Sequence, residues 1–294
     1  MDAAYLDLLV HPVSKEKLKY NDAGNYLTTG GDAGQFPVIK NVPVLLSHNT
    51  GKEGNFNYQE HYEKDAEAYD YFADWEDGQQ EESRRLRQHI LREIPKQAKW
   101  VLDVGCGGGW LAKALCAGKQ RVISTDISTK NPIKAVENIP APTHFGLVAD
   151  VFALPLKENS IDCIVSSEVI EHVPDPKAFI VALYKVLSPG GTLIITTPYN
   201  EKIQQSLCIH CNHLTPHNAH LHSFTRQKIE SLIPAEAVGV RTSICNSKAL
   251  VILRLHLLLR FLPFSLWNIA DKIMLKLSRK KALRLILVLQ KKTH

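Results

Sequence analysis

Three aspartates follow three successive apolar runs, and their spacing is the strongest chemical signal in the sequence. Asp103 lies in VLDVGCGGGW (Val101–Trp110), Asp126 ends VISTD and Asp150 ends GLVAD. Each run is predicted to be a buried strand, so the three carboxylates would gather at one edge of a parallel sheet. There an acid can accept hydrogen bonds from an ammonium group, a ribose diol or an adenine amino group.

The glycine loop after the first of these runs narrows the choice of ligand. A dinucleotide-binding loop reads G-x-G-x-x-G, and counting from Gly105 its third glycine would fall on Trp110. A phosphate-binding loop closes with Lys-Ser or Lys-Thr, which this loop lacks. The loop instead reads D-x-G-x-G-x-G through Gly107 and Gly109. Its acid would repel a pyrophosphate but can accept from the ammonium group of an amino acid. On its own, the loop is also compatible with a tight turn that holds no ligand.

A second group of chemically active residues lies in SSEVIEHV, after the fourth predicted strand. Glu168, Glu171 and His172 are spaced i, i+3 and i+4, so a helix starting there would place them on one face. Two carboxylates and an imidazole suit a divalent ion, or a general base with an orienting acid. Alternatively, Glu171 and His172 cap and orient the helix.

The segment CIHCNHLTPHNAHLHSF (Cys208–Phe224) contains two cysteines and five histidines. This density is typical of a zinc site, although the spacing matches no standard zinc finger. The ligands would be Cys208, Cys211, His220 and His222. The alternatives are a loop facing a substrate and an incidental cluster.

The elements that position these residues begin at Trp100, where short apolar runs alternate with helical stretches. This alternation predicts an α/β fold: a Rossmann-like, seven-stranded, mostly parallel sheet flanked by helices. We place this domain at residues 100–294. A small N-terminal β domain at residues 1–47 and a linker with two helices at residues 48–99 precede it.

The C-terminal part is basic and rich in leucine. Ala249–His294 contains ten Lys or Arg and one acid, which leaves 25 basic and 29 acidic residues in the rest of the chain. Residues 247–280 are predicted to form a basic, apolar helical insertion before the last strand (Ala282–Lys292). Two arginines and a proline interrupt Leu250–Ala270, so this stretch should not span a bilayer. Its composition favours contact with a membrane surface through Leu250–Lys281. A cap that buries its leucines on its own domain or in a dimer is the alternative.

The overall composition is that of an ordinary globular protein. Apolar residues make up 45% and charged residues 22%, which excludes disorder and low complexity. The six cysteines form no regular framework, and Met1–Leu9 with its two aspartates is unlike a secretory leader. We therefore expect a reducing cytoplasmic location, peripheral at the inner face of the membrane. The sequence does not indicate an oligomeric state.

In order and spacing, the motifs resemble those of class I S-adenosylmethionine-dependent methyltransferases of type 11. DVGCGGGW, STDIS, VADVFALPLKENSIDCIVSSEVIEHVPD and LSPGGTLIITTPY carry the resemblance, which extends from Asn57 to Phe224. It implies that S-adenosyl-L-methionine is the cofactor. The loop glycines and first acid would approach its methionine part, the second acid its ribose, and the third acid its adenine. The implied cofactor residues are Asp103, Gly105, Gly107, Gly109, Asp126, Asp150 and Val151.

SSEVIEHV is similar to the corresponding segment of ubiquinone-pathway O-methyltransferases, where Glu-x-x-Glu-His is associated with magnesium. The resemblance implies Glu168, Glu171 and His172 as metal ligands, for Mg²⁺ or alternatively Zn²⁺. HLHSF resembles a loop in which a histidine faces the substrate, so His172, Glu171 and His222 are the catalytic candidates. Methylases of amide or adenine nitrogens carry an Asn-Pro-Pro-Tyr-type motif at the place of SSEVIEHV, so we expect methylation at oxygen. The helix around Tyr58–Tyr69 resembles the family's lid, unless its aromatic residues only pack it down.

The N-terminal unit has a resemblance of its own. HPVSKEKL and FPVIKNVPVLL are similar to the zinc-ribbon-derived β domain of a tRNA-methyltransferase activator subunit. Where that family often has Cys-Pro-x-Cys, this chain has His11 and Ser14, so we expect a metal-free module packed on its neighbour.

Together these observations predict an S-adenosylmethionine-dependent methyltransferase (EC 2.1.1.-) that acts at oxygen on a small, lipophilic acceptor. One alternative is methylation of tRNA or protein, which the activator-like module suggests. The acidic body and the lack of an aromatic, basic groove make nucleic acid an unfavourable partner. A catalytically silent cofactor-binding scaffold is the second alternative.

Overall fold

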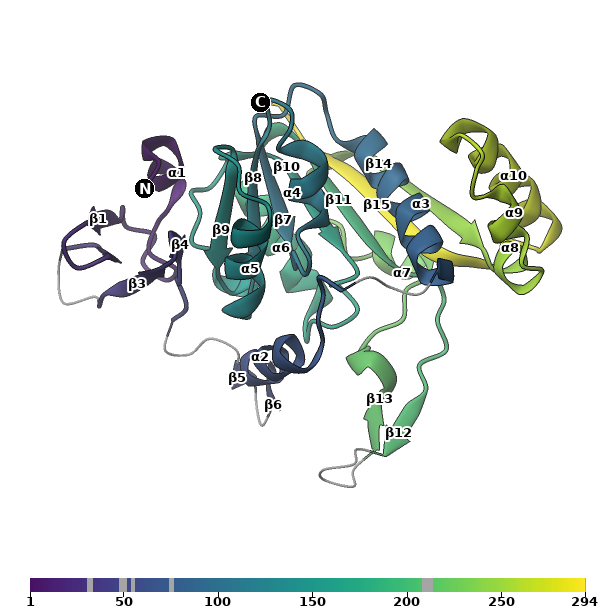
Figure 1. Ribbon diagram of the computed structural model, residues 1–294, viewed down its shortest axis with the longest axis horizontal. Coiled ribbons are helices and arrows are strands. Elements are labelled where there is room, and N and C mark those ends of the chain that lie inside the picture. Colours follow the sequence, from purple (N-terminus) through teal and green to yellow (C-terminus); the bar gives the residue numbers. More distant parts are fainter. Residues whose placement is uncertain (31–33, 48–51, 54–55, 74–76, 208–213, 294) are drawn as a thin grey trace.

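The computed structural model describes residues 1–30, 34–47, 52–53, 56–73, 77–207 and 214–293. A twisted central sheet separates the small N-terminal unit from a group of helices that precedes the last strand (Figure 1). The predicted α/β fold class is confirmed.

The central sheet has seven strands in the order β14-β15-β11-β10-β7-β8-β9. Neighbours from β11 through β9 pair in parallel, whereas β15 runs antiparallel to both β11 and β14. The chain order reverses between β7 and β10, which is where open sheets of this kind form a ligand crevice. The strands are β7 (Trp100–Val104), β8 (Arg121–Asp126), β9 (His144–Val148), β10 (Ile161–Ser167), β11 (Leu187–Pro198), β14 (Ala237–Ser247) and β15 (Ala282–Lys291).

Helices cover both faces of this sheet, so the strands are apolar on both sides. On one face, α3 (Asp77–Glu93) and α4 (Trp110–Leu115) pack on Val101, Val165 and their neighbours. The other face packs against α6 (Pro176–Val186) and α7 (Arg226–Glu230), and α5 (Lys130–Asn138) contacts β8 and β9. The start of α6 is set by its sequence: Asp175 accepts hydrogen bonds from two backbone amides, and a proline follows it.

The N-terminal unit consists of α1 (Ala3–Leu8) and a four-stranded sheet, and its core is continuous with that of the main domain. The Tyr5 hydroxyl donates to the Gly146 carbonyl over 2.7 Å, and Val44 forms a parallel bridge with Val148 of β9. His11 Nδ1 accepts from the backbone amide of Ser14 (3.0 Å), so this ring nitrogen is used within the turn. The strands are β1 (Lys19–Asn21), β2 (Tyr26–Thr28), β3 (Phe36–Ile39) and β4 (Val42–Pro43).

Two peripheral segments flank the carboxyl ends of the parallel strands. The first is α2 (Tyr58–Ala68), which follows the short hairpin β5 (Lys52–Glu53) and β6 (Phe56–Asn57) and lies below the sheet in Figure 1. The second lies after β11 and contains β12 (Gln205–Leu207), β13 (Leu214–Pro216) and the 3₁₀ turn η2 (His217–Ala219). A further 3₁₀ turn, η1 (Val151–Ala153), follows β9.

Three helices lie between β14 and β15: α8 (Lys248–Ile252), α9 (Leu255–Leu259) and α10 (Phe264–Leu277). Their inner face is packed, because Phe264 and Trp267 are buried and Asp271 accepts from the backbone amides of Asn246 and Ser247. Their outer face leaves ten large apolar side chains exposed: Val251, Ile252, Leu253, Leu257, Leu258, Phe261, Leu266, Ile269, Ile273 and Leu277. Of the helices in the described ranges, none is long and apolar enough to span a membrane.

Candidate functional site

A cavity of about 1440 Å³ lies at the carboxyl ends of β7, β8, β9 and β10. Its wall includes Gly105, Asp126, Asp150 and His172, which come from four different strand ends. Pockets for small molecules usually measure about 300–1000 Å³. The cavity therefore has room for a cofactor and a second molecule.

The glycine loop needs glycine because of both its backbone and its neighbours. Gly105 and Gly107 have φ angles of +71° and +45°, which side chains rarely adopt. A Cβ on Gly108 would lie only 2.3 Å from the carbonyl oxygen of Tyr71, so a segment far away in sequence crosses the loop closely. Gly109 faces Ala135 of α5 instead, and it is not among the residues that line the cavity. Its place is therefore in helix packing rather than in the cavity wall.

Two of the three predicted acids line the cavity. Asp126 accepts hydrogen bonds from the Ser128 amide (3.0 Å) and the Asn131 side chain (3.1 Å), which hold its carboxylate at the end of β8. Asp150 accepts from the Phe152 amide (3.0 Å) and from the Tyr58 hydroxyl (2.6 Å).

The third acid, Asp103, lies behind the loop instead of in the cavity wall. It is 2% exposed, and its Oδ2 has no hydrogen-bond partner in the described part of the chain. Burial raises the pKa of Asp103 to about 7; the Asp126 charge adds to this effect and Arg87 opposes it. Asp103 can therefore act on a ligand only through the loop, or after the loop moves.

Helix α2 lies over the part of the cavity next to Asp126 and Asp150 and is held there by polar contacts. Tyr58 contacts Asp150, and the Glu63 carboxylate accepts from the Thr129 amide (2.8 Å) and the Thr129 hydroxyl. The Tyr58 and Phe152 rings meet edge to face with centroids 6.2 Å apart. The aromatic residues of this segment thus both pack the helix down and line the cavity.

The prediction of a helix that begins at Glu168 is wrong. After β10 the chain forms turns, Glu168 adopts φ +59°, and helix α6 begins only at Pro176. Two prolines one residue apart, Pro174 and Pro176, prevent a helix from running through this stretch. The Glu168 side chain consequently pairs with Arg284 Nε over 2.8 Å and accepts from the Thr196 hydroxyl over 3.1 Å.

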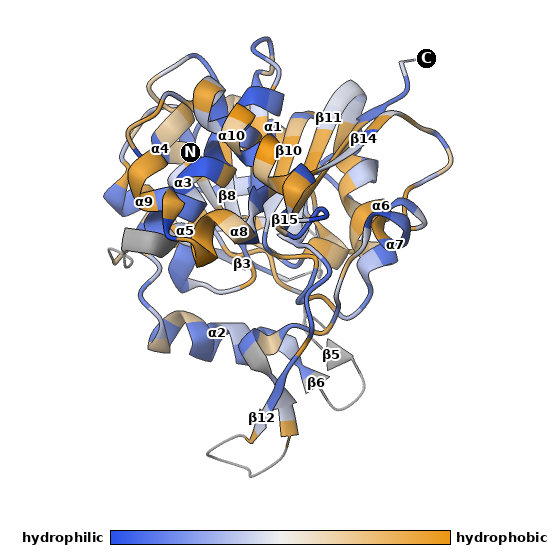
Figure 2. Ribbon diagram, turned by 90° about the vertical axis from the view of Figure 1, so that its right-hand side faces the viewer, coloured by the Kyte–Doolittle hydropathy of each residue, from blue (hydrophilic) through white to orange (hydrophobic). Residues whose placement is uncertain are grey.

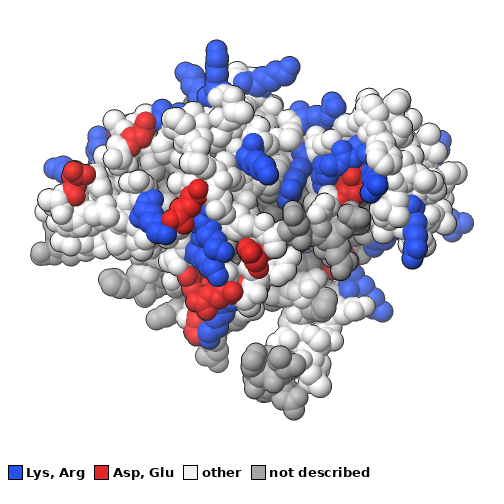
Figure 3. Space-filling view, viewed as in Figure 1, with Lys and Arg blue, Asp and Glu red and all other residues white. Residues whose placement is uncertain are grey.

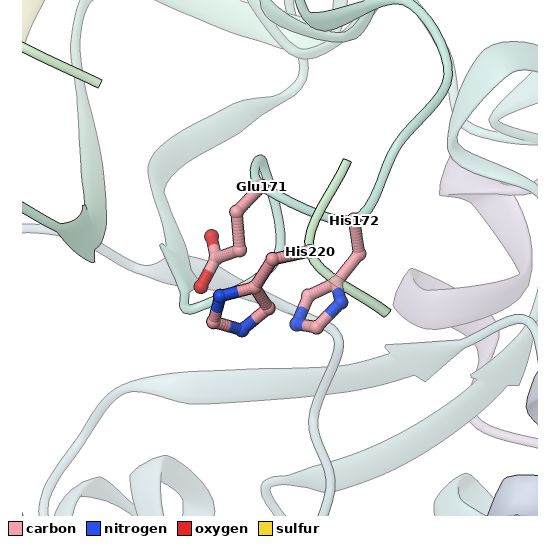
Figure 4. A group of neighbouring side chains, drawn as sticks. All are labelled: Glu171, His172 and His220. Carbon is pink, nitrogen blue, oxygen red and sulfur yellow. The ribbon is translucent and has the colours of Figure 1, made fainter. Parts of the chain in front are cut away.

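Glu171 and His172 instead meet His220, and one ligand atom from each of the three lies within 4.8 Å of the others (Figure 4). Glu171 is 1% exposed; its Oε2 accepts from the Thr197 hydroxyl (3.0 Å), and its Oε1 has no partner among the described residues. Burial raises the pKa of Glu171 well above its usual range and lowers that of His172 to about 4. His172 is therefore a neutral imidazole at physiological pH.

His220 is fixed by contacts that the sequence did not reveal. Its Nδ1 donates to Glu201 over 2.5 Å, and the amides of Leu221 and His222 donate to the Glu171 carbonyl (2.8 and 3.1 Å). Sequence reasoning missed Glu201, although an acid shortly after the fifth strand of the sheet was a usable signal. It named His220 only as a zinc ligand.

His222, a predicted catalytic residue, points into the turn after β10. Its Nε2 donates to the carbonyls of Val173 (3.0 Å) and Pro174 (3.3 Å), and it does not line the cavity. That side chain supports the turn after β10. Cys208 and Cys211, the other predicted zinc ligands, lie outside the described residues.

Comparison with known proteins agrees with this geometry. Residues 102–195 match the family model described as a methyltransferase domain. The ubiquinone biosynthesis O-methyltransferase of Psychrobacter arcticus is 32% identical over 111 residues, which cover 36% of this chain and 43% of that enzyme. The mitochondrial ubiquinone biosynthesis O-methyltransferase of Rattus norvegicus is 33% identical over 167 residues, covering 50% of this chain and 46% of that enzyme. The chain thus spans less than half the length of these curated relatives.

Among solved structures, a SAM-dependent methyltransferase from Archaeoglobus fulgidus superposes with a TM-score of 0.50 at 15% identity. The superposition covers 72% of this chain and 94% of that structure, and it shows the shared fold.

Strand order, glycine loop and strand-end acids are those of the class I methyltransferase fold. The match to the methyltransferase-domain family covers residues 102–195, which hold the first five strands of the main sheet.

Proposed function

We propose that this protein transfers the methyl group of S-adenosylmethionine to an oxygen atom of a small, lipophilic acceptor. The observation that carries the proposal is one continuous cavity. The glycine loop, Asp126 and Asp150 line one part of it, and His172 and His220 line another. A cofactor site and a polar acceptor site therefore share one space.

The cofactor would lie across the carboxyl ends of β7, β8 and β9. Asp126 would accept hydrogen bonds from the ribose hydroxyls, and Asp150, with Val151 and Phe152 beside it, would hold the adenine. The loop at Gly105 and Gly107 allows the methionine part to approach the backbone closely. Arg87 of α3, which lines the cavity and stacks on Trp110 with its guanidinium 5.3 Å from the ring centroid, is placed to pair with the cofactor carboxylate.

S-adenosylmethionine supplies an already activated methyl group, so the protein has mainly to align the acceptor oxygen and remove its proton. His172 and His220 lie where that hydroxyl would meet polar atoms. Tyr62 contributes an aromatic ring that meets His172 edge to face, with the ring centroids 6.1 Å apart. Glu171 lies directly behind them. The names of the curated relatives, which are O-methyltransferases of ubiquinone biosynthesis, support oxygen and a lipophilic acceptor.

We further propose that the outer face of α8–α10 rests on the cytoplasmic face of a membrane. Leu258 and Phe261 are 73% and 79% exposed, and the ribbon of α8–α10 carries much of the orange of hydrophobic residues in Figure 2. Lys and Arg side chains surround this region at the right of Figure 3, which suits an anionic lipid surface. Arg260 belongs to this insertion and also lines the cavity, so an acceptor held in the membrane would have a short path to the site.

Transfer of labelled methyl from S-adenosylmethionine tests the proposed reaction. We expect turnover with phenols or catechols that carry a prenyl tail, slower turnover without the tail, and no turnover by Asp126→Ala. Labelling of RNA or protein without labelling of any phenol would favour the alternative substrates. Cofactor binding without any methyl transfer would favour the silent scaffold.

Liposome flotation tests the proposed membrane contact. Phe261→Glu should reduce binding to vesicles that contain anionic lipid, because it places a charge in the centre of the apolar face. Val13→Glu is the matched control, since Val13 is 68% exposed and belongs to the N-terminal unit, which lies at the opposite end of the molecule from α8–α10 in Figure 1. The apolar face would instead be a subunit interface if Phe261→Glu left flotation unchanged but dissociated a dimer of the wild type.

A further inference from the structure

The metal site expected from the sequence does not form. Glu168, Glu171 and His172 were to share one helix face, but the stretch is not helical and Glu168 points to Arg284. Arg284 also pairs with Glu82 over 2.9 Å, so Glu168 belongs to a separate ion-pair network with its own cation. These three residues do not fit a common metal ion, and no step of the proposed reaction is routed through one bound by them.

We propose that Glu171, His172 and His220 instead form a site for a Zn²⁺-class transition-metal ion, open to the acceptor side of the cavity. The three side chains come from two segments, the turn after β10 and the turn after η2, and Figure 4 shows them converging. The Leu221 and His222 amides bind the Glu171 carbonyl and hold the two segments together.

Glu171 supplies the strongest indication of a missing positive charge. A carboxylate that is 1% exposed is costly to bury unless something compensates its charge. Thr197 satisfies Oε2, whereas Oε1 has no partner among the described residues. Arg284 is already paired with Glu168 and Glu82. A metal ion at this point would give the buried Oε1 a partner and compensate the charge of the carboxylate.

The two histidines are prepared as ligands. Nδ1 of His172 donates to the Ala219 carbonyl (3.3 Å) and Nδ1 of His220 donates to Glu201 (2.5 Å), which leaves the Nε2 lone pair of each ring for a ligand. A carboxylate behind an imidazole is the usual outer partner of a metal-bound histidine. The ring centroids lie 4.8 Å apart, and Figure 4 shows Nε2 of His172 pointing toward His220.

Two nitrogens and one oxygen select the class of ion. Mg²⁺ prefers octahedral oxygen ligands, whereas imidazole suits Zn²⁺ and its first-row neighbours. A tetrahedral Zn²⁺ needs ligand atoms about 3.4 Å apart, so ligand atoms that now lie up to 4.8 Å apart would close by up to about 1.4 Å. Three protein ligands leave a fourth position, where the ion would bind and polarise an acceptor oxygen. Only this last role rests on the proposed function; binding of the ion does not.

Cobalt titration of the full chain, stripped with a chelator, tests the site by absorption spectroscopy. We expect one equivalent of Co²⁺ to produce visible d–d bands without the near-ultraviolet band of sulfur ligation, and Zn²⁺ to displace it where Mg²⁺ does not. His220→Ala and His172→Ala should abolish the bands, and Glu201→Gln should weaken binding about 10–100-fold. Glu168→Gln is the matched control and should bind as the wild type does.

A double variant, Cys208→Ser with Cys211→Ser, separates this site from a thiolate site in the same segment. Unchanged Co²⁺ spectra in that variant support the proposal. Loss of the Co²⁺ spectra in the double cysteine variant, with the spectra kept in His220→Ala, would overturn the proposal. So would a wild type that binds neither Co²⁺ nor Zn²⁺. Circular dichroism and thermal unfolding of each variant identify those that fail to fold, for which His220→Gln serves as the second test. Methyl transfer is not measured, so failure here leaves the proposed function untouched.

Discussion

Replacing Arg85 should loosen the helical insertion from the rest of the domain. Arg85 lies on α3 with its side chain 1% exposed, and its Nε pairs with Glu81 over 2.6 Å. Its Nη2 donates to the carbonyls of Leu259, Arg260 and Leu262 at 3.0, 3.1 and 3.2 Å, where α9 ends. One guanidinium therefore satisfies three carbonyls of the insertion and neutralises a nearly buried acid.

The size of the effect follows from burial. Removing the buried partner of an ion pair costs about 3–5 kcal/mol. In Arg85→Ala, Glu81 keeps only its exposed partner Arg84, and the Leu259 and Leu262 carbonyls lose their donor. Arg84 provides a matched comparison, since it pairs with the same Glu81 over 2.7 Å but its side chain is 44% exposed. An exposed pair contributes at most about 1 kcal/mol. Arg85→Ala should thus lower the free energy of unfolding several times more than Arg84→Ala.

Equilibrium unfolding in urea measures this difference. The free energy of unfolding falls with urea concentration by about 3 kcal/mol/M, the upper end for small proteins. Arg85→Ala should therefore lower the urea midpoint by about 1–2 M, and Arg84→Ala should lower it by less than about 0.4 M. A double variant, Glu81→Met with Arg85→Met, should recover much of the loss because no buried charge remains unpaired. Equal shifts for Arg84→Ala and Arg85→Ala would refute the reasoning.

Three further predictions concern the cavity and the insertion. Tyr58→Phe removes the hydroxyl that contacts Asp150 at 2.6 Å, and should weaken cofactor affinity by a factor that corresponds to about 0.5–1.5 kcal/mol, measured by calorimetry; an unchanged affinity would show that the lid contact is not used in the complex. Gly108→Ala puts a Cβ 2.3 Å from the Tyr71 carbonyl and should impair cofactor binding more than Gly118→Ala, whose Cβ comes no closer than 3.2 Å to another residue; equal affinities would argue against a closed lid. Asp271→Ala leaves the Asn246 and Ser247 amides without their acceptor, which should destabilise the protein by about 1–3 kcal/mol per amide in thermal or urea unfolding, and an unaltered midpoint would contradict that role.

The main sheet and the cofactor side of the site were readable from the sequence because they depend on short local patterns. Apolar runs that each end in an acid predicted β7, β8 and β9, and the glycine spacing predicted the turn after β7. The carboxyl ends of parallel strands must meet, so placing Asp126 and Asp150 together required no knowledge of distant contacts.

The part of the site around Glu171, His172 and His220 depends on contacts that local spacing does not encode. The helical period of 3.6 residues grouped Glu168 with Glu171 and His172. In the structure the prolines after them end any helix, and Glu168 adopts φ +59°. His220 is held near Glu171 by backbone hydrogen bonds from Leu221 and His222 to the Glu171 carbonyl, which join positions 50 and 51 residues apart in the sequence. Its alternation with His222 was visible in HLHSF, but nothing local showed which ring faces the cavity.

Calorimetric binding of S-adenosylhomocysteine to the wild type and to Asp126→Ala tests the central claim most directly. We predict one site per chain in the wild type and an affinity at least tenfold lower in the variant, because a ribose hydroxyl pair would lose its charged acceptor. An Asp126→Asn variant, of nearly the same shape, should fall between the two. A wild type that does not bind the ligand, or an Asp126→Ala variant that binds it equally well, would contradict the assignment of the cavity to S-adenosylmethionine.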